Sequence, residues 1–218
     1  MATELNYRLA VESDSEAILE FLSIYFVKDE PCLRALQLEL NETREILQTI
    51  ISRCLKTPFS TVVTASDSEI VAVLLNSVWN KSDNLEDVDF ENSESSEKLK
   101  IFCNLLNKAH SMFWPLNPTN IEAVLHREVS SVATHFQRKG IATRLLTENL
   151  NSEQLKTYQI GGIVSETTSH ANQQLLAKHG FQKLAEFPYE ECVDSKGNKV
   201  IKTDDGSTGV RLNFKPIP

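Results

Sequence analysis

The sequence predicts an α/β (α+β) fold in which one mixed β-sheet carries helices on both faces. Two short apolar runs at 59–65 and 70–78, separated by a Ser-Asp-Ser turn, indicate a β-hairpin. Strand, helix and strand patterns then follow one another at 128–135, 140–149 and 160–165. A hairpin is antiparallel, whereas strands joined through a helix are parallel, so the combination predicts a mixed sheet covered on both faces.

Composition excludes several classes of protein. The chain has 218 residues, of which 41% are hydrophobic and 24% charged, as in globular proteins, and we expect one domain over 1–218. Its net charge of −8 argues against a nucleic-acid partner, which needs a basic surface. No apolar run approaches the roughly 20 residues of a membrane helix, and the first residues do not resemble a signal peptide. We therefore expect no membrane partner.

Cysteine and histidine spacing bears on compartment and metal content. The four cysteines are far apart and form no Cys-x-x-Cys pair, so zinc ribbons and redox pairs are not expected. This usage favours a reducing compartment, and we predict a cytoplasmic protein. The five histidines show no metal-binding spacing, and the sequence predicts no metal site.

The first half of the chain contains three strand patterns and three helix patterns. The residue before a proline disfavours helical geometry, so Pro31 is expected to end the first helix near Glu30, and Ser13 is its candidate cap. A polar, acidic stretch at 81–97 has no apolar period and is expected to be a surface loop. The expected strands are 7–11, 59–65 and 70–78, and the expected helices are 14–27, 34–40 and 42–55.

The second half alternates helices and strands. A core-forming helix is expected to end at Pro115 and Pro118, and Gly180 is a plausible C-terminal cap of the last helix. The expected helices are 98–113, 140–149 and 170–178, and the expected strands are 128–135, 160–165, 181–186 and 210–214.

The most informative segment lies between the strand at 128–135 and the helix that follows it. A tight loop that enters a helix presents backbone N–H groups without partners, and the helix dipole favours an anion there. Small residues leave room for a diphosphate, and basic residues add positive charge. The alternative is an ordinary strand-to-helix turn with exposed basic side chains. The segment comprises Gln137, Arg138, Lys139, Gly140, Ile141 and Ala142.

This loop resembles the acetyl-CoA pyrophosphate loop of the GCN5-related N-acetyltransferase superfamily. A strand rich in small residues precedes it, and Lys178-His179-Gly180-Phe181 is similar to the helix of that superfamily that ends in Gly-Phe. The resemblance implies a mostly antiparallel sheet with helices on both faces and acetyl-CoA as co-substrate, bound by the residues of the loop. It also implies that backbone N–H groups of the preceding strand stabilise the thioester oxygen. These groups belong to Ser130, Ser131 and Val132.

A closer resemblance is carried by two further segments. Lys28-Asp29-Glu30-Pro31 resembles a segment of the insect-type arylalkylamine N-acetyltransferases, and Thr168-Ser169-His170 is similar to the Ser-Ser-His of that group. The resemblance implies acetylation of small primary amines, among them dopamine, serotonin, tyramine and tryptamine, by direct attack of the amine on the thioester.

Amine acetylation requires a proton acceptor, because an amine of pKa near ~10 is mostly protonated at neutral pH. The resemblance assigns this role to Glu30, which Pro31 is expected to hold extended at the end of a helix. The alternative is that Asp29 and Glu30 are solvated acids at a helix end, and we expect Asp29 to be structural.

The acid that would protonate the leaving thiolate is not evident. Many members of the superfamily have a tyrosine at the position of Leu176, which cannot donate a proton. The arylalkylamine-type enzymes use serines near the start of this helix, and those positions correspond to Thr168 and Asn172. Thr168 and its neighbour Ser169 keep a hydroxyl, and Asn172 can donate a hydrogen bond. Ser169 and Asn172 could equally cap the helix.

Two other functions fit the same residues. One is an N-acyltransferase for another amine, such as a polyamine, or for a longer acyl chain. The other is a catalytically weak acyl-CoA-binding protein, which the asparagine at 172 favours and the presence of Glu30 disfavours. We assign no role to His135 or His170. Trp79, Trp114 and Phe113 could wall an aromatic pocket, although core packing is the expected role.

Overall fold

The structure is a computed structural model that describes residues 4–65, 69–83, 95–117 and 120–217. The turn expected at 66–68, most of the polar loop expected at 81–97, and Pro118 lie outside the described residues.

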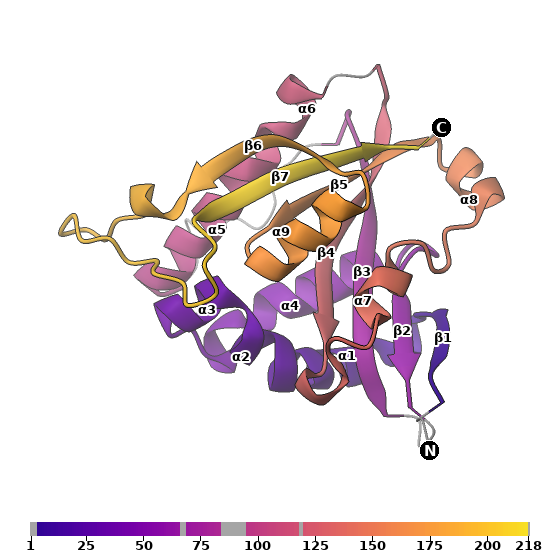
Figure 1. Ribbon diagram of the computed structural model, residues 1–218, viewed down its shortest axis with the longest axis horizontal. Helices are drawn as coiled ribbons and strands as arrows, with labels where there is room; N and C mark the ends of the chain where they lie inside the picture. Colours follow the sequence, from indigo (N-terminus) through magenta and orange to yellow (C-terminus); the bar gives the residue numbers. More distant parts are fainter. Residues whose placement is uncertain (1–3, 66–68, 84–94, 118–119, 218) are drawn as a thin grey trace.

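The described residues form a seven-stranded sheet in the order β1-β2-β3-β4-β5-β7-β6 (Figure 1). Strands β4 and β5 are parallel, and every other pair of neighbouring strands in this sheet is antiparallel. The mixed, mostly antiparallel sheet expected from the sequence is thereby confirmed. The strands are β1 (Asn6–Leu9), β2 (Thr61–Thr64), β3 (Ile70–Asn80), β4 (Ala123–Val132), β5 (Ile160–Thr167), β6 (Gln182–Pro188) and β7 (Gly209–Pro216).

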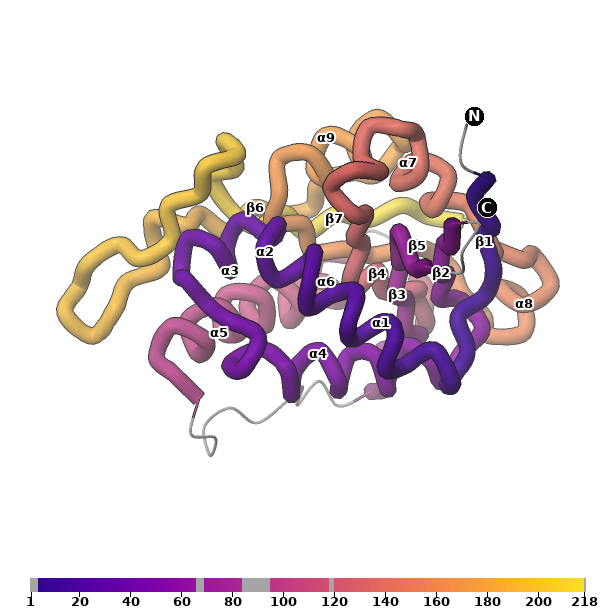
Figure 2. The backbone as a smooth tube through the Cα atoms, turned by 90° about the horizontal axis from the view of Figure 1, so that it is seen from below, coloured from indigo at the N-terminus to yellow at the C-terminus, as the bar shows by residue number. Residues whose placement is uncertain are grey.

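Helices cover both faces of the sheet (Figure 2). One face carries α1 (Ser15–Phe21), α2 (Val27–Asp29), α3 (Pro31–Leu36), α4 (Leu40–Cys54) and α5 (Glu97–Ser111). The opposite face carries α7 (Ile141–Leu145) and α9 (His170–Lys178). Two further short α-helices are α6 (Phe113–Leu116) and α8 (Ser152–Thr157), and the described 3-10 helices are Glu12–Asp14, Thr134–Phe136 and Tyr189–Glu191. A π-helical segment, Leu22–Phe26, connects α1 to α2.

The core fills the space between the sheet and each helical layer. Strand β2 is buried along its whole length, as expected of a strand packed on both faces. Ile18 and Leu22 pack with Ile51 of α4 against the central strands. Leu176 of α9 packs with Phe59 on the other face, and both side chains are fully buried. The leucine at position 176 is therefore a core residue.

Several expected boundaries differ from the observed ones. The strand expected at 128–135 begins five residues earlier, because its first residues pair with both β3 and β5. The helix expected at 140–149 is shorter, and α8, which the sequence analysis did not predict, follows it. The helix expected at 98–113 ends at Ser111, and Pro115 lies inside α6 rather than ending a helix.

The region around Pro31 differs in an informative way. Proline lacks an N–H and has a fixed φ, which suits the first turn of a helix. Pro31 therefore starts α3, whereas the sequence analysis expected a helix only from Arg34. Glu30 is extended, with φ −71° and ψ 121°, as predicted from the proline that follows it. At the other end of this helical run, Asp14 rather than Ser13 is the N-cap residue of α1.

The two parallel strands separate part-way along their length. Pairing between β4 and β5 extends from Ala123 and Ile160 to His126 and Val164. Beyond that point Ser165 Oγ donates a hydrogen bond to the carbonyl of Arg127 at 3.3 Å, and β5 continues by pairing with β7 alone. The remaining residues of β4 thus have no strand beside them on this side.

The packing of β5 against β7 yields a testable prediction. A Cβ added to Gly162 would lie 2.3 Å from Cε2 of Phe214, which is fully buried. Gly162→Ala is expected to lower the free energy of unfolding by about 1–3 kcal/mol, the usual effect of overpacking. Phe214→Leu should remove the clash, so the double variant should lose less stability than the sum of the single variants. Urea denaturation of the four proteins measures this, and strictly additive losses would contradict it.

Candidate active site

The loop after β4 has the conformation that its sequence predicts. Gly140 has φ +81°, which favours glycine, and a Cβ added there would meet nothing within 4 Å. The space beside this backbone is therefore open to a ligand. Arg138 and Lys139 are exposed, whereas the side chain of Ile141 is buried, so Ile141 and its neighbour Ala142 can offer the loop only backbone groups.

Asp29 connects this loop to the end of α2. Its Oδ2 accepts hydrogen bonds from Gln137 Nε2 at 3.1 Å and from Thr134 Oγ1 at 3.2 Å. Gln137 Nε2 also donates to the carbonyl of Val132 at 3.1 Å. The amide of Gln137 thus holds the loop in place, and Asp29 has the structural role expected from the sequence.

The backbone of β4 faces the separation between the strands at alternate residues. Ala133 N–H donates to the carbonyl of Val71 at 2.8 Å, and Val132 pairs with Ala72 in the same ladder. Val132 is therefore in a non-hydrogen-bonded pair, and its own N–H points away from β3. By the same alternation Ser130 N–H points away from β3 and Ser131 N–H points toward it. Two of the three expected backbone donors thus face the open side of β4.

Glu30 is buried, with 6% of its surface exposed, so the alternative of a solvated acid is wrong. Its Oε2 accepts a hydrogen bond from Leu33 N–H at 2.5 Å, which caps α3. Burial raises the pKa of the Glu30 carboxyl, and the Thr168 hydroxyl and the Leu33 N–H partly oppose this. Oε1 has no hydrogen-bond partner in the described part of the chain. This oxygen is itself fully buried, and Glu30 is not among the residues that line the cavity described below.

The residues at the start of α9 divide their roles. Ser169 is the N-cap residue, and its Oγ accepts the N–H of Asn172 at 3.3 Å, as one alternative from the sequence predicted. The carbonyl of Thr168 accepts a hydrogen bond from the Tyr189 hydroxyl at 2.7 Å. The structure thus brings Thr168 to Glu30, uses Ser169 as a cap, and leaves Asn172 half-buried in the first turn of α9.

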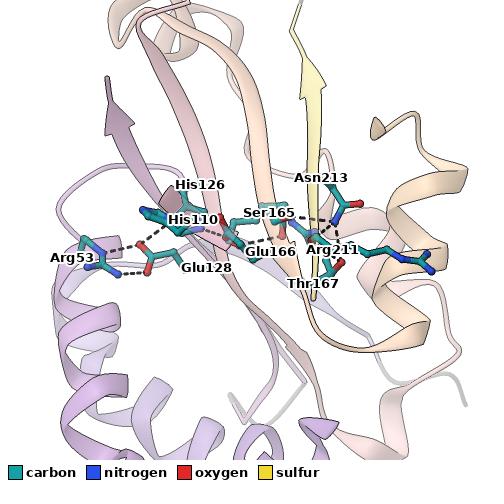
Figure 3. Close-up of polar contacts among 10 residues, drawn as sticks. Arg53, His110, His126, Glu128, Ser165, Glu166, Thr167, Arg211 and Asn213 are labelled. Atoms are coloured by element: carbon teal, nitrogen blue, oxygen red, sulfur yellow. Dashed lines mark hydrogen bonds and ion pairs between the residues drawn. The ribbon is translucent and has the colours of Figure 1, made fainter. Parts of the chain in front are cut away.

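An apolar cavity of about 160 Å³ lies on the α4 and α5 side of the sheet. Its polar lining contains Thr43, Asn107 and a row of five side chains that begins on α4 and ends on β5 (Figure 3). Glu128 and Glu166 come from the two strands that separate, so the cavity adjoins the point of separation. The apolar lining comprises Phe26, Leu33, Ile46, Leu47, Ile50, Leu99, Phe102, Cys103, Leu106 and Val129, and the polar row comprises Arg53, Glu128, His126, His110 and Glu166.

Each carboxylate in this row has a cationic or hydrogen-bonding partner. Arg53 binds Glu128 through Nε at 2.8 Å and Nη2 at 2.5 Å. Glu166 Oε2 lies 2.5 Å from His126 Nε2, and Oε1 lies 3.3 Å from His110 Nδ1. Burial raises the pKa of the Glu166 carboxyl, but the opposing attraction of His126 and the bonds to both histidines dominate and hold it well below its usual range. Among the described groups, neither carboxylate is left as an uncompensated buried charge.

No sequence pattern predicts this row. Its residues are far apart in the chain and follow no recognised spacing, so only their meeting in the fold identifies them. Trp79 stacks on the His110 ring with the ring centroids 3.9 Å apart, and Phe113 and Trp114 pack against Trp79. The three aromatic residues thus pack together behind the cavity and do not line it.

Arg127 points to the opposite face of the sheet from His126 and Glu128, its neighbours along β4. It is 4% exposed, and its three guanidinium nitrogens have no hydrogen-bond partner within the described ranges. Burial lowers the pKa of this guanidinium to about 10. The face that carries α7 and α9 therefore has unused hydrogen-bond donors beside the strand separation.

Comparison with solved structures identifies the fold, while no protein-family model matches the chain. Arylalkylamine N-acetyltransferase 2 from Aedes aegypti superimposes with a TM-score of 0.85 at 20% identity, over 99% of this chain and 100% of that one. The fold is that of the GCN5-related N-acetyltransferases.

Two further structures show the range of proteins with this fold. A Drosophila melanogaster polyamine N-acetyltransferase that forms N-acetylagmatine matches with a TM-score of 0.79 at 14% identity, over 98% of this chain and 100% of that one. The C-terminal condensation domain of Ebony, in complex with β-alanyl-dopamine, matches with a TM-score of 0.75 at 18% identity, over 99% and 100%. At these identities the comparisons confirm the fold expected from the loop and the Gly-Phe segment.

The buried ion pair makes a prediction about stability. Arg53→Met leaves Glu128, whose side chain is 4% exposed, without its bidentate partner. The free energy of unfolding should fall by about 3–5 kcal/mol, because an uncompensated carboxylate remains buried. Lys199→Met is the control, since Lys199 pairs with Glu190 at the surface, where the side chains are 66% and 71% exposed, and the pair should contribute less than about 1 kcal/mol. Equal losses in chemical denaturation would contradict the distinction.

Proposed function

We propose that the protein is an acetyl-CoA-dependent N-acetyltransferase for small primary amines. The observation that carries the proposal is the separation of β4 and β5, which has an open anion-binding loop on one face of the sheet and an apolar cavity on the other. A cofactor on the α7 side and an amine in the cavity would meet between the strands. The same fold in three neighbours supports this arrangement.

The residues supply most of the chemistry that the reaction needs. Glu30, which does not line the cavity, accepts a proton from the bound ammonium through a water relay, and the neutral amine attacks the thioester carbonyl. The N–H groups of Ser130 and Val132 stabilise the oxyanion that forms. A C–N bond forms and the C–S bond breaks, and the second proton of the nitrogen passes to the leaving thiolate of coenzyme A, with the Thr168 hydroxyl beside Glu30 as a candidate relay. Arg138 and Lys139 supply positive charge for the diphosphate.

We propose arylalkylamines as the acceptors, as the resemblance of the Lys-Asp-Glu-Pro and Thr-Ser-His segments implies. The apolar walls of the cavity suit an aromatic ring. Glu128 is already paired with Arg53, so it offers little to the second cation of a polyamine. A polyamine, a longer acyl chain, and an acyl-CoA-binding protein with weak catalysis remain the alternatives.

The state of the cysteines bears on the compartment. The described cysteines, Cys32, Cys54, Cys103 and Cys192, are all free thiols, which supports the cytoplasmic location that we propose. Within the described residues, no helix has the length and apolar character required to cross a bilayer.

One experiment decides among these functions. The protein is incubated with acetyl-CoA and a panel of amines comprising dopamine, tyramine, tryptamine, agmatine and spermidine, and free thiol is measured. Thiol release with the aromatic amines supports the proposal, and release with the aliphatic amines alone favours the polyamine alternative. Binding of acetyl-CoA without thiol release from any amine would indicate an acyl-CoA-binding protein.

Cofactor binding provides a second test. Acetyl-CoA at 100 times its dissociation constant should stabilise the fold by about 2.7 kcal/mol. Gly140→Glu places a carboxylate where the diphosphate would bind and should abolish the thermal shift. Gly197→Glu is a matched control, because Gly197 also has a positive φ and open space around it but lies in a turn before β7. A shift that persists in Gly140→Glu would disprove the binding site.

The proposed base makes a prediction about pH. Glu30→Gln keeps an oxygen for the Leu33 N–H and should lower kcat about 100-fold, a typical loss for a general base. Thr168→Ala removes a hydrogen bond that lowers the pKa of Glu30, so that pKa should rise. Because the base acts when deprotonated, the acidic limb of kcat against pH should move to higher pH in Thr168→Ala. Thr168→Ser should leave the limb in place, and identical limbs in all three proteins would exclude Glu30 as the titrating base.

A further inference from the structure

We infer that His110, His126 and Glu166 form a binding site for a divalent transition-metal ion, represented by Zn²⁺, at the polar end of the cavity. The three residues come from α5, β4 and β5, and one ligand atom of each lies within 4.8 Å of the other two. This site is separate from the proposed acetyl transfer, and its test requires no catalytic activity.

The donor atoms lie close to coordination geometry. Zinc binds imidazole nitrogen and carboxylate oxygen at about 2.0–2.2 Å, so two donors of a tetrahedral site lie roughly 3.3 Å apart. His110 Nδ1 and Glu166 Oε1 are already separated by 3.3 Å. His126 Nε2 and Glu166 Oε2 are 2.5 Å apart and must open by about 1 Å, which a small rotation of the Glu166 side chain can supply.

Residues around the cluster act on each imidazole. Trp79 stacks on His110 with an interplanar angle of 8°, which restricts rotation of that ring. Glu128 Oε1 lies 4.0 Å from His126 Nδ1, on the opposite side of the ring from Glu166. At this distance the carboxylate forms no hydrogen bond with the ring nitrogen, so its effect on His126 is electrostatic only.

Charge in the row favours a cation at this position. Arg53 occupies both carboxylate oxygens of Glu128, so the negative charge of Glu166 is the one that a metal ion would meet. The cavity borders all three proposed ligands, which leaves an open coordination position for water.

The ligand set indicates the class of metal. Two imidazoles and one carboxylate suit zinc, cobalt, nickel or copper, whereas calcium and magnesium prefer sites made of oxygen. Cys103 also lines the cavity but is not part of the cluster, so a thiolate is not expected among the ligands.

Metal titration tests the proposal. The full-length chain is treated with EDTA, dialysed, and titrated with ZnCl₂ in a calorimeter and with CoCl₂ in a spectrophotometer. One ion per chain is expected, with the intense visible absorption of four-coordinate Co²⁺ and no thiolate charge-transfer band. Absence of saturable binding, or a thiolate band, would overturn the site.

Two variants assign the binding to these residues. His110→Phe removes a nitrogen ligand but retains a ring against Trp79, and it should weaken zinc binding about 100-fold or more. His135→Phe is the matched control, because His135 is exposed outside the cluster, and it should bind zinc like the wild type. Glu166→Gln provides a second variant if His110→Phe does not fold, as judged by circular dichroism. Unchanged affinity in a folded variant of either ligand would refute the proposal.

Discussion

The rest of the site depends on the early end of pairing between the two parallel strands. β4 and β5 share only the short ladder that ends at His126 and Val164. Buried backbone N–H and C=O groups that are not paired with a neighbouring strand need other hydrogen-bond partners. On this side of β4, Ser165 Oγ donates to the carbonyl of Arg127, and Gln137 Nε2 donates to the carbonyl of Val132. The N–H groups of Ser130 and Val132 face the separation. One interruption of the sheet therefore produces both a gap for ligands and preorganised donors within it.

The same interruption explains where charge is buried. Two strands that remained paired would hold His126, Glu128 and Glu166 against neighbouring side chains, whereas their separation leaves a cavity beside these groups. Buried charges are tolerated when partners surround them, and Arg53 and the two histidines supply those partners. This row is thus a second polar centre near the candidate active site, built from different residues.

Adjacent residues in the Lys-Asp-Glu-Pro segment show how local sequence and tertiary contacts combine. Pro31 starts α3 and holds Glu30 extended, so the carboxylate of Glu30 turns inward and caps that helix. Asp29 ends the preceding helix, stays near the surface and binds Gln137 of the loop after β4. The local effect of the proline could be predicted from the sequence. The burial of Glu30 could not, because it depends on residues distant in the sequence, such as Thr168.

Local and medium-range patterns determined the sheet type, the hairpin, the order of the elements and the glycine-dependent loop at 137–142, because alternation, helical spacing and proline geometry act over a few residues. Strand and helix limits such as the start of β4 at Ala123 followed from pairing with strands distant in sequence. The polar row at the cavity was decided entirely by the tertiary structure. His110 and Glu166 are 56 residues apart in the sequence. No local pattern links them, because they come together only when α5 packs on the sheet beside β5.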